Sequence, residues 1–140
     1  EGRSLEKEFL LRIGNIRQYM NDALALDPER VQAIKDRLHN AIAELKVNVD
    51  ENRFEQELIY YLEKLDITEE KVRLTNHLDY FLETINGKEA NGRKLGFITQ
   101  EMGREINTMG SKSNHAQMQK LVVMMKDELE KIKEQVLNVL

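Results

Sequence analysis

The stretch that decides the fold of this chain is GRKLGFITQEMGREINTMGSK, which occupies residues 92–112. Its apolar side chains recur every three or four residues, which is the period of one face of an α-helix. The members of this row are Leu95, Ile98, Met102, Ile106 and Met109. Charged and amide side chains lie between them. The stretch therefore predicts an amphipathic helix over about 93–109, with Gly110 as its left-handed stop.

The same apolar spacing continues in both directions and predicts further helices over about 4–26, 28–47, 51–64, 68–85 and 115–138. Asp27, Asp50 and Thr68 are suitable N-caps for three of these helices. No segment shows the period-two alternation of a strand. We therefore expect an all-α fold of about six helices in an elongated bundle. The long first and last helices have seams that suit association between subunits.

The length, net charge and composition of the chain limit the functions that it can have. The chain has 140 residues and a net charge of -4, which suits a single helical domain over 1–140 and argues against a strongly basic nucleic-acid-coating module. There is no cysteine, which excludes disulfides and thiolate metal sites. No apolar run approaches the ~20 residues of a membrane span, so we expect no membrane partner. Because the chain is acidic overall, we do not expect DNA as a partner either. The chain does not begin with methionine, and we expect it to be the C-terminal fragment of a longer protein whose N-terminal domain is absent.

Two glutamates flank the apolar row of 92–112. Glu101 and Glu105 are four residues apart and therefore project from the same side of the helix. Paired carboxylates of this kind bind divalent metals in helical bundles, and oxygen ligands favour Mg²⁺ or Mn²⁺. The alternative is a pair of salt bridges, for example Glu101 with Arg104 and Glu105 with Arg73.

A second group of chemically active side chains precedes this helix. Glu70, Arg73 and His77 are spaced three and four residues apart, and Asp66 lies one turn before them. Such a face can ligate a metal or act as acid and base around a phosphate. The alternative is that Glu70 is a partner of the helix dipole, Arg73 an ion-pair partner and His77 a half-buried side chain.

The basic side chains of the chain are densest around the 92–112 helix. Arginine forks and lysines match the oxygens of phosphate, and with neighbouring amides and hydroxyls they can hold an RNA backbone. Four cations in an acidic chain are also ordinary, so spacing alone leaves this open. The residues concerned are Arg93, Lys94, Arg104, Lys112, Asn107, Thr108 and Ser111. Ser111 lacks the Gly-x-Ser-x-Gly setting of a serine hydrolase, and the chain has no Walker or dinucleotide motif.

Ordered motifs extend over nearly the whole chain. They are EG at 1–2 followed by Leu5, RxExE at 53–57, KxDITEExxRLxxHL at 64–78, GRKLxFxxQEMxRExNTxGSK at 92–112 and KxELEKIxEQVxN at 126–138. In this order they resemble the C-terminal half of the YicC/YloC family of bacterial proteins. The sequence departs from the usual family pattern at Gly96, where Asp is frequent, and at Gly103, where Asn is frequent.

The resemblance implies a cytoplasmic, metal-dependent endoribonuclease that uses Mn²⁺ or Mg²⁺, acts on RNA and assembles as a homo-oligomer, a hexamer in the full-length family. Combined with the carboxylates and cations described above, it leads us to expect catalysis by Glu101, Glu105 and His77. The expected metal ligands are Glu70, His77, Glu101, Glu105 and Asp66. The expected contacts to the RNA backbone are Arg73, Arg93, Lys94, Arg104, Asn107, Ser111 and Lys112. Two alternatives remain: an oligomerisation scaffold whose Glu and Arg residues form ion pairs between helices, and an RNA-binding domain that does not cut.

Overall fold

A computed structural model describes residues 2–87 and 92–139 of the chain, and these ranges form helices without any strand. The helices are α1 (Gly2–Ala25), α2 (Asp27–Leu45), α3 (Glu51–Leu65), α4 (Thr68–Asn86), α5 (Gly92–Lys112) and α6 (Ala116–Val136). The prediction of an all-α, elongated bundle of about six helices is therefore confirmed. Association between subunits stays a prediction.

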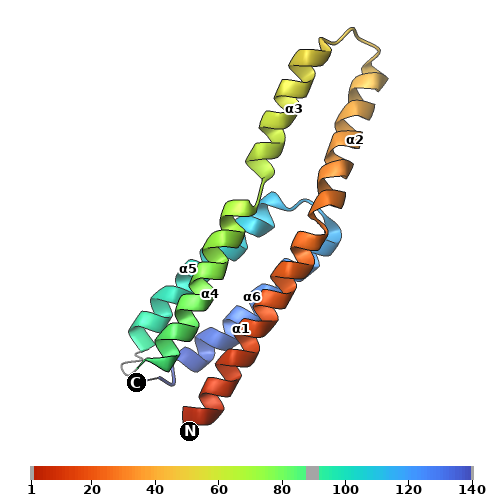
Figure 1. Cartoon of the computed structure of the whole chain (residues 1–140). Helices are drawn as coiled ribbons and strands as arrows, with labels where there is room; N and C mark the ends of the chain where they lie inside the picture. Colours follow the sequence, from red (N-terminus) through yellow and green to blue (C-terminus); the bar gives the residue numbers. More distant parts are fainter. Residues whose placement is uncertain (1, 88–91, 140) are drawn as a thin grey trace.

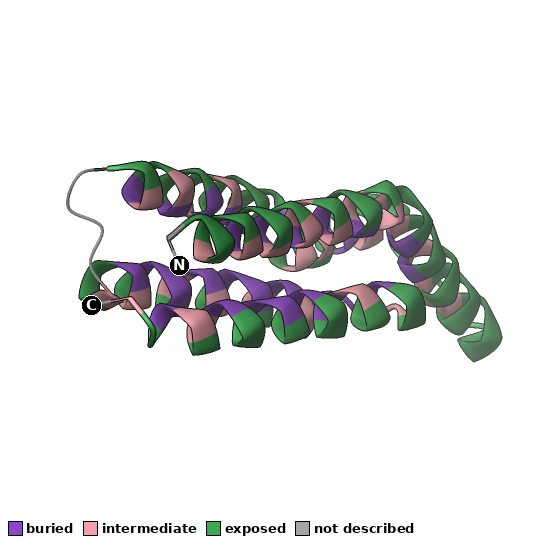
Figure 2. Cartoon of the chain, turned by 90° about the horizontal axis from the view of Figure 1, so that it is seen from below, coloured by how far each residue is buried: buried purple, intermediate pink, exposed green. Residues whose placement is uncertain are grey.

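Four of the helices, α1, α4, α5 and α6, lie side by side and enclose the core (Figure 1). Their buried residues face one another along the length of the bundle, while the outer faces are exposed (Figure 2). Phe81 is fully buried on α4, and its ring meets that of Phe9 on α1 edge to face at 5.1 Å between centroids. Burial of this continuous apolar seam is the main source of stability for these helices.

The other two helices, α2 and α3, extend beyond the bundle as an arm (Figure 1). The arm buries only Ile34, Leu58 and the charged Arg30 among the residues of these two helices. The apolar spacing of 28–47 and 51–64 predicts that Leu45 and Tyr61 face inward, which is wrong, since their exposed fractions are 66% and 41%. For Leu45 the reason is geometric: an apolar stripe is buried only where another element covers it, and no bundle helix reaches the outer part of the arm (Figure 1).

The helix ends show where local signals fail. Asp50 caps α3 as predicted, because its carboxylate accepts from the backbone N–H groups of Asn52 and Arg53. Asp27 and Thr68 are not the N-caps of α2 and α4; Leu26 and Ile67 hold those positions, without a side-chain cap. Gly110 does not stop α5, which continues to Lys112, and no described glycine has a positive φ.

None of the described helices combines the length and the apolar character that crossing a bilayer requires. The glycines inside α5, which are Gly96, Gly103 and Gly110, differ in their surroundings. A Cβ at Gly103 would lie 3.4 Å from a methyl group of Leu129 on α6, whereas nothing lies within 4 Å of one at Gly96. The contact at Gly103 is an ordinary one, and the tighter approach is at Gly110, where a Cβ would lie 3.1 Å from a methyl group of Val122; nothing in the surroundings of Gly96 explains its glycine.

Candidate metal centre

Helices α4 and α5 pack against each other and bring together one imidazole and two carboxylates. His77 of α4 and Glu101 and Glu105 of α5 each offer one ligand atom, and these three atoms all lie within 4.8 Å of one another. His77 Nε2 is 3.9 Å from Glu105 Oε2. His77 thus lies close in space to two glutamates that follow it by 24 or more positions in the sequence.

The apolar stripes of the two helices place these side chains at the edge of the core. His77 precedes Leu78, which is fully buried on α4, and Glu105 precedes Ile106, which is fully buried on α5. Glu105 itself is 7% exposed, whereas His77 keeps 26% of its side chain accessible. The group therefore has a buried carboxylate on its inner side and an open side toward solvent.

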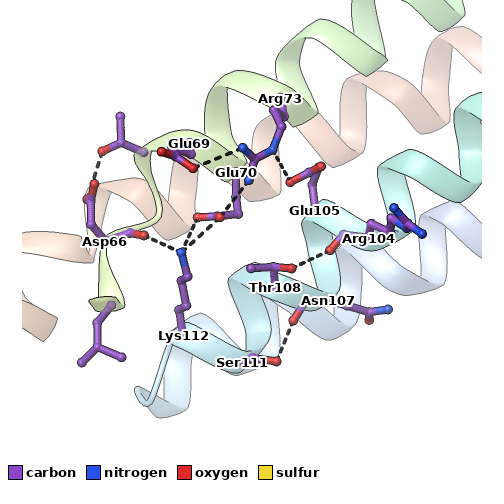
Figure 3. A network of polar contacts seen from close by, with 12 residues as sticks. Asp66, Glu69, Glu70, Arg73, Arg104, Glu105, Asn107, Thr108, Ser111 and Lys112 are labelled. Carbon is purple, nitrogen blue, oxygen red and sulfur yellow. Dashed lines mark hydrogen bonds and ion pairs between the residues drawn. The ribbon is translucent and has the colours of Figure 1, made fainter. Parts of the chain in front are cut away.

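Arg73 holds Glu105 in place from the neighbouring turn of α4. Its Nε donates to Glu105 Oε1 at 2.9 Å, and its two terminal nitrogens donate to Glu70 at 3.1 Å and to Glu69 at 3.2 Å (Figure 3). The hydrogen bond to Glu105, followed by that to Glu69, raises the pKa of the Arg73 guanidinium above its ordinary value. Arg73 is therefore a permanent cation that orients Glu105 and leaves its second oxygen, Oε2, facing His77.

Glu70 and Asp66, which the sequence suggested as further metal ligands, lie outside this group. Glu70 is only 2% exposed, and Lys112 Nζ donates to both of its carboxylate oxygens at 3.2 and 3.1 Å. Lys112 also donates to the backbone carbonyl of Asp66, while the Asp66 carboxylate accepts from the Thr68 hydroxyl (Figure 3). These two carboxylates are therefore committed to ion pairing and to the start of α4.

The donor set fits a divalent ion of the expected kind. Carboxylates suit Mg²⁺ and Mn²⁺, and an imidazole shifts the preference toward Mn²⁺. Ligands about 2.1 Å from a single ion lie at most about 4.2 Å apart. Three ligands that share one ion at that distance are about 3.0–3.6 Å from one another, so the three atoms, all within 4.8 Å of one another, need to approach by up to about 1–2 Å, and the part-exposed Glu101 side chain has freedom to move. Three protein ligands leave coordination positions for water or for phosphate oxygens.

Ion pairing, the alternative interpretation, is also present in the structure. The Glu105–Arg73 pair forms, whereas Glu101 makes no ion pair with Arg104 within the described residues. The two interpretations of Glu105 therefore concern different oxygens of the same carboxylate: Oε1 faces Arg73 and Oε2 faces His77.

The predicted RNA-backbone residues fall into four groups, three of which lie in the second half of α5 or pair with it. Arg73 and Lys112 are engaged with carboxylates. Arg104 and Asn107 are exposed on α5, and their side chains make no hydrogen bond within the described residues (Figure 3). Ser111 donates to the carbonyl of Asn107.

Arg93 and Lys94 lie at the opposite end of α5 from Lys112. There the Lys94 ammonium is 5.0 Å from the centre of the Tyr80 ring. Arg104 is three residues after Glu101 and so lies one turn from it on α5, whereas Asn107, two residues after Glu105, projects from roughly the opposite side of the helix.

Sequence reasoning missed one residue that organises this region, Arg30. Its side chain is 2% exposed, and it donates to the carbonyls of Leu65 and Lys112, the last residues of α3 and α5. Asp27 three residues earlier neutralises it. An Asp-x-x-Arg spacing at a helix start was the only available signal, and it does not distinguish a surface pair from a buried one.

The comparison with known proteins agrees with the pattern of motifs. A family model described as "Endoribonuclease YicC-like, C-terminal" matches residues 23–140. The chain belongs to this family. Its curated relatives include a probable endoribonuclease YicC of Clostridioides difficile, 37% identical over 99% of this chain and 48% of that protein. Another, from Haemophilus influenzae, is 31% identical over 91% of this chain and 47% of that protein. The chain thus spans about half the length of these curated relatives.

Proposed function

We propose that this chain is the part of a metal-dependent endoribonuclease that holds the divalent ion. The proposed ligands are His77, Glu101 and Glu105, with Mn²⁺ preferred over Mg²⁺. RNA is the substrate, and the reaction is cleavage of a phosphodiester bond in the cytoplasm. The observation that carries the proposal is the convergence of three ligand atoms from two helices within 4.8 Å. Family membership supports the choice of RNA.

Each residue of the proposed site has a task that follows from its position. Glu105 is buried and fixed by Arg73, so it supplies a carboxylate oxygen in a constant place. His77 and Glu101 complete the ligand set from the solvent side. Arg104 is exposed one turn along α5 and binds a phosphate of the strand. When bound, the metal supplies an activated water or neutralises charge at phosphorus.

A metal-binding measurement with matched variants tests the proposal directly. Mn²⁺ binding to the intact chain is measured by calorimetry for the wild type, Glu105→Gln and His77→Ala. Both variants should bind at least 10–100-fold more weakly, because even loss of a residue that only supports a ligand has effects of that size. Glu69→Gln is the control, since Glu69 also pairs with Arg73 but is not among the three converging ligands. Its Mn²⁺ affinity should match that of the wild type.

Cleavage of a labelled single-stranded RNA is then followed with the intact protein that carries this chain. Glu105→Gln and His77→Ala should lose Mn²⁺-dependent cleavage, and Glu69→Gln should retain it. The proposal fails if both ligand variants bind Mn²⁺ and cut RNA like the wild type.

The scaffold alternative rests on a specific observation of its own. Arg73 joins Glu105 across α4 and α5, and Lys112 joins the buried Glu70 across the same helices. If these pairs serve only to fasten the helices, Glu105→Gln lowers the melting temperature and no Mn²⁺ binding is found in the wild type. The same calorimetry therefore separates the two candidates. Assembly as a hexamer stays a prediction of the resemblance.

A further inference from the structure

A pocket lies at the base of the arm, away from the candidate metal centre. Its volume is about 390 Å³, within the range of sites for small organic ligands. Helices α2 and α3 form one wall, and the end of α5 with the connection to α6 forms the other. The floor includes Ile34, which is 4% exposed. The pocket is thus formed by segments that meet only where the arm joins the bundle.

Two polar side chains of this pocket have unused hydrogen-bonding capacity. Ser113 is 1% exposed, and its hydroxyl has no partner in the described structure. Gln119 donates from Nε2 to the carbonyls of Gly110 and Ser113 at 2.6 Å each, which leaves its carbonyl oxygen Oε1 as an acceptor. Buried polar groups without partners are rare in folded proteins. Ser113 lines the pocket, and its buried hydroxyl is therefore available to a ligand or to an ordered water.

A cation and an aromatic ring complete the lining. Arg37 of α2 is exposed, and its guanidinium makes no hydrogen bond or ion pair within the described residues. Tyr61 of α3 is 41% exposed, and no cation covers its ring there. The adjacent Tyr60 differs, because the Lys64 ammonium lies 4.5 Å from the centre of its ring. Tyr61 therefore offers an open ring face at the pocket, and Tyr60 does not line it.

We propose that this pocket binds one unpaired nucleotide of an RNA strand. The base stacks on the ring of Tyr61, its edge meets the Gln119 carbonyl and the Ser113 hydroxyl, and a flanking phosphate pairs with Arg37. A ring, a guanidinium and amide and hydroxyl groups at the edge are the groups that recognise splayed-out bases of single-stranded RNA. This inference rests on the proposed function for its choice of RNA.

The position of the pocket suits a strand that also reaches the metal centre. Lys112 lines the pocket and Glu105 belongs to the centre, and both lie on α5. Seven residues of helix separate them, which is about 10 Å along the axis. Single-stranded RNA spans that distance in very few nucleotides. The pocket would therefore hold a nucleotide close to the scissile bond and select unpaired RNA.

Binding without divalent metal tests this inference separately from cleavage. Fluorescence anisotropy of a labelled single-stranded oligoribonucleotide is measured with the intact chain in EDTA at low salt. Tyr61→Ala should weaken binding about tenfold, the scale of one base–aromatic stack. Tyr60→Ala is the matched control and should bind like the wild type. The inference is overturned if the wild type does not bind, if Tyr61→Ala binds normally, or if both variants weaken binding equally.

Two further variants examine the polar groups. Arg37→Gln should reduce the slope of log affinity against log salt by about one, since one phosphate contact is lost. Ser113→Ala should weaken binding several-fold if the hydroxyl meets the base. A Ser113→Ala variant that melts higher and binds normally would show that the hydroxyl is only an unpaired core group. A duplex RNA that competes as well as a single strand would contradict recognition of an unpaired base.

Failure of this inference is distinguishable from failure of the proposed function. If the wild type cuts RNA and Tyr61→Ala binds and cuts normally, the pocket assignment is wrong and the metal site stands. If Tyr61→Ala weakens metal-free binding while the wild type never cuts RNA with Mn²⁺, the pocket stands and the catalytic proposal is wrong.

Discussion

Replacing Arg30 with methionine should destabilise the chain strongly, because this one side chain joins three helices. Its Nε donates to Asp27 Oδ1 at 2.8 Å, its Nη1 to the Lys112 carbonyl at 2.8 Å and its Nη2 to the Leu65 carbonyl at 2.9 Å. Leu65 and Lys112 end α3 and α5, so the guanidinium lies at two negative helix C-termini whose carbonyls lack helical partners. Arg30 therefore holds the base of the arm to the bundle.

The magnitude follows from what remains after the change. Removing one partner of a buried ion pair costs about 3–5 kcal/mol, because the other partner stays buried and unpaired. Asp27 is 25% exposed and regains some hydration, which favours the lower part of that range. Methionine retains most of the aliphatic volume, so a cavity adds little. A loss of about 3 kcal/mol corresponds to a decrease in melting temperature of about 10 °C for a domain of this size.

Urea and thermal unfolding followed by circular dichroism measure both quantities. Arg37→Met is the matched control, because Arg37 is on the same helix but exposed and without an ion pair in the described residues; it should change stability by less than about 0.5 kcal/mol. Arg30→Lys retains the charge without the planar fork and should fall between the two. The reasoning is refuted if Arg30→Met unfolds at the same urea concentration as Arg37→Met. If Arg30→Met does not fold, Arg30→Lys supplies the measurement.

Three further outcomes follow from the same network. Glu70→Gln should lower the free energy of unfolding by about 2–3 kcal/mol, because its buried carboxylate loses two cationic partners. The same variant should leave Mn²⁺ affinity within twofold. A large loss of affinity in calorimetry would show that Glu70 is a ligand. Asp79→Ala removes an exposed pair with Arg17 and should cost less than about 1 kcal/mol in urea unfolding. Arg73→Gln should weaken Mn²⁺ binding about 10–100-fold, because Glu105 loses the partner that orients it; unchanged or tighter binding would show that Arg73 does not position Glu105 for the metal.

The helices themselves were predictable because their signal is local and repeated. A residue such as Phe81 takes part in a stripe with period 3.6, and only a helix brings such a stripe to one face. Helix ends depend on single side chains that have several options. The Asp27 carboxylate, suited to cap α2, instead binds the buried Arg30, and the Thr68 hydroxyl donates to Asp66. These partners lie only three and two residues away, so capping competes with other local bonds of the same side chain, and spacing along the chain does not show which bond forms.

In the candidate site, too, the part that depends on local spacing was predictable and the part that depends on helix packing was not. The spacing of Glu101 and Glu105 indicates a shared face in any α-helix. That His77 meets them depends on the packing of α4 against α5, which the family resemblance suggested and periodicity did not. Glu70 was included among the metal ligands because no local pattern shows that Lys112, 42 residues later, lies against it.

The network of ion pairs and the proposed metal site are not competing descriptions of one carboxylate. Glu105 accepts from Arg73 through Oε1, and a carboxylate fixed at one oxygen presents the other in a defined direction, here toward His77. Partners of this kind orient metal ligands and change affinity without touching the ion. The scaffold alternative therefore explains the Arg73 pair and the 3.9 Å approach of His77 to Glu105, but it leaves unexplained why a second carboxylate, that of Glu101, converges on the same place. That remaining feature favours metal binding.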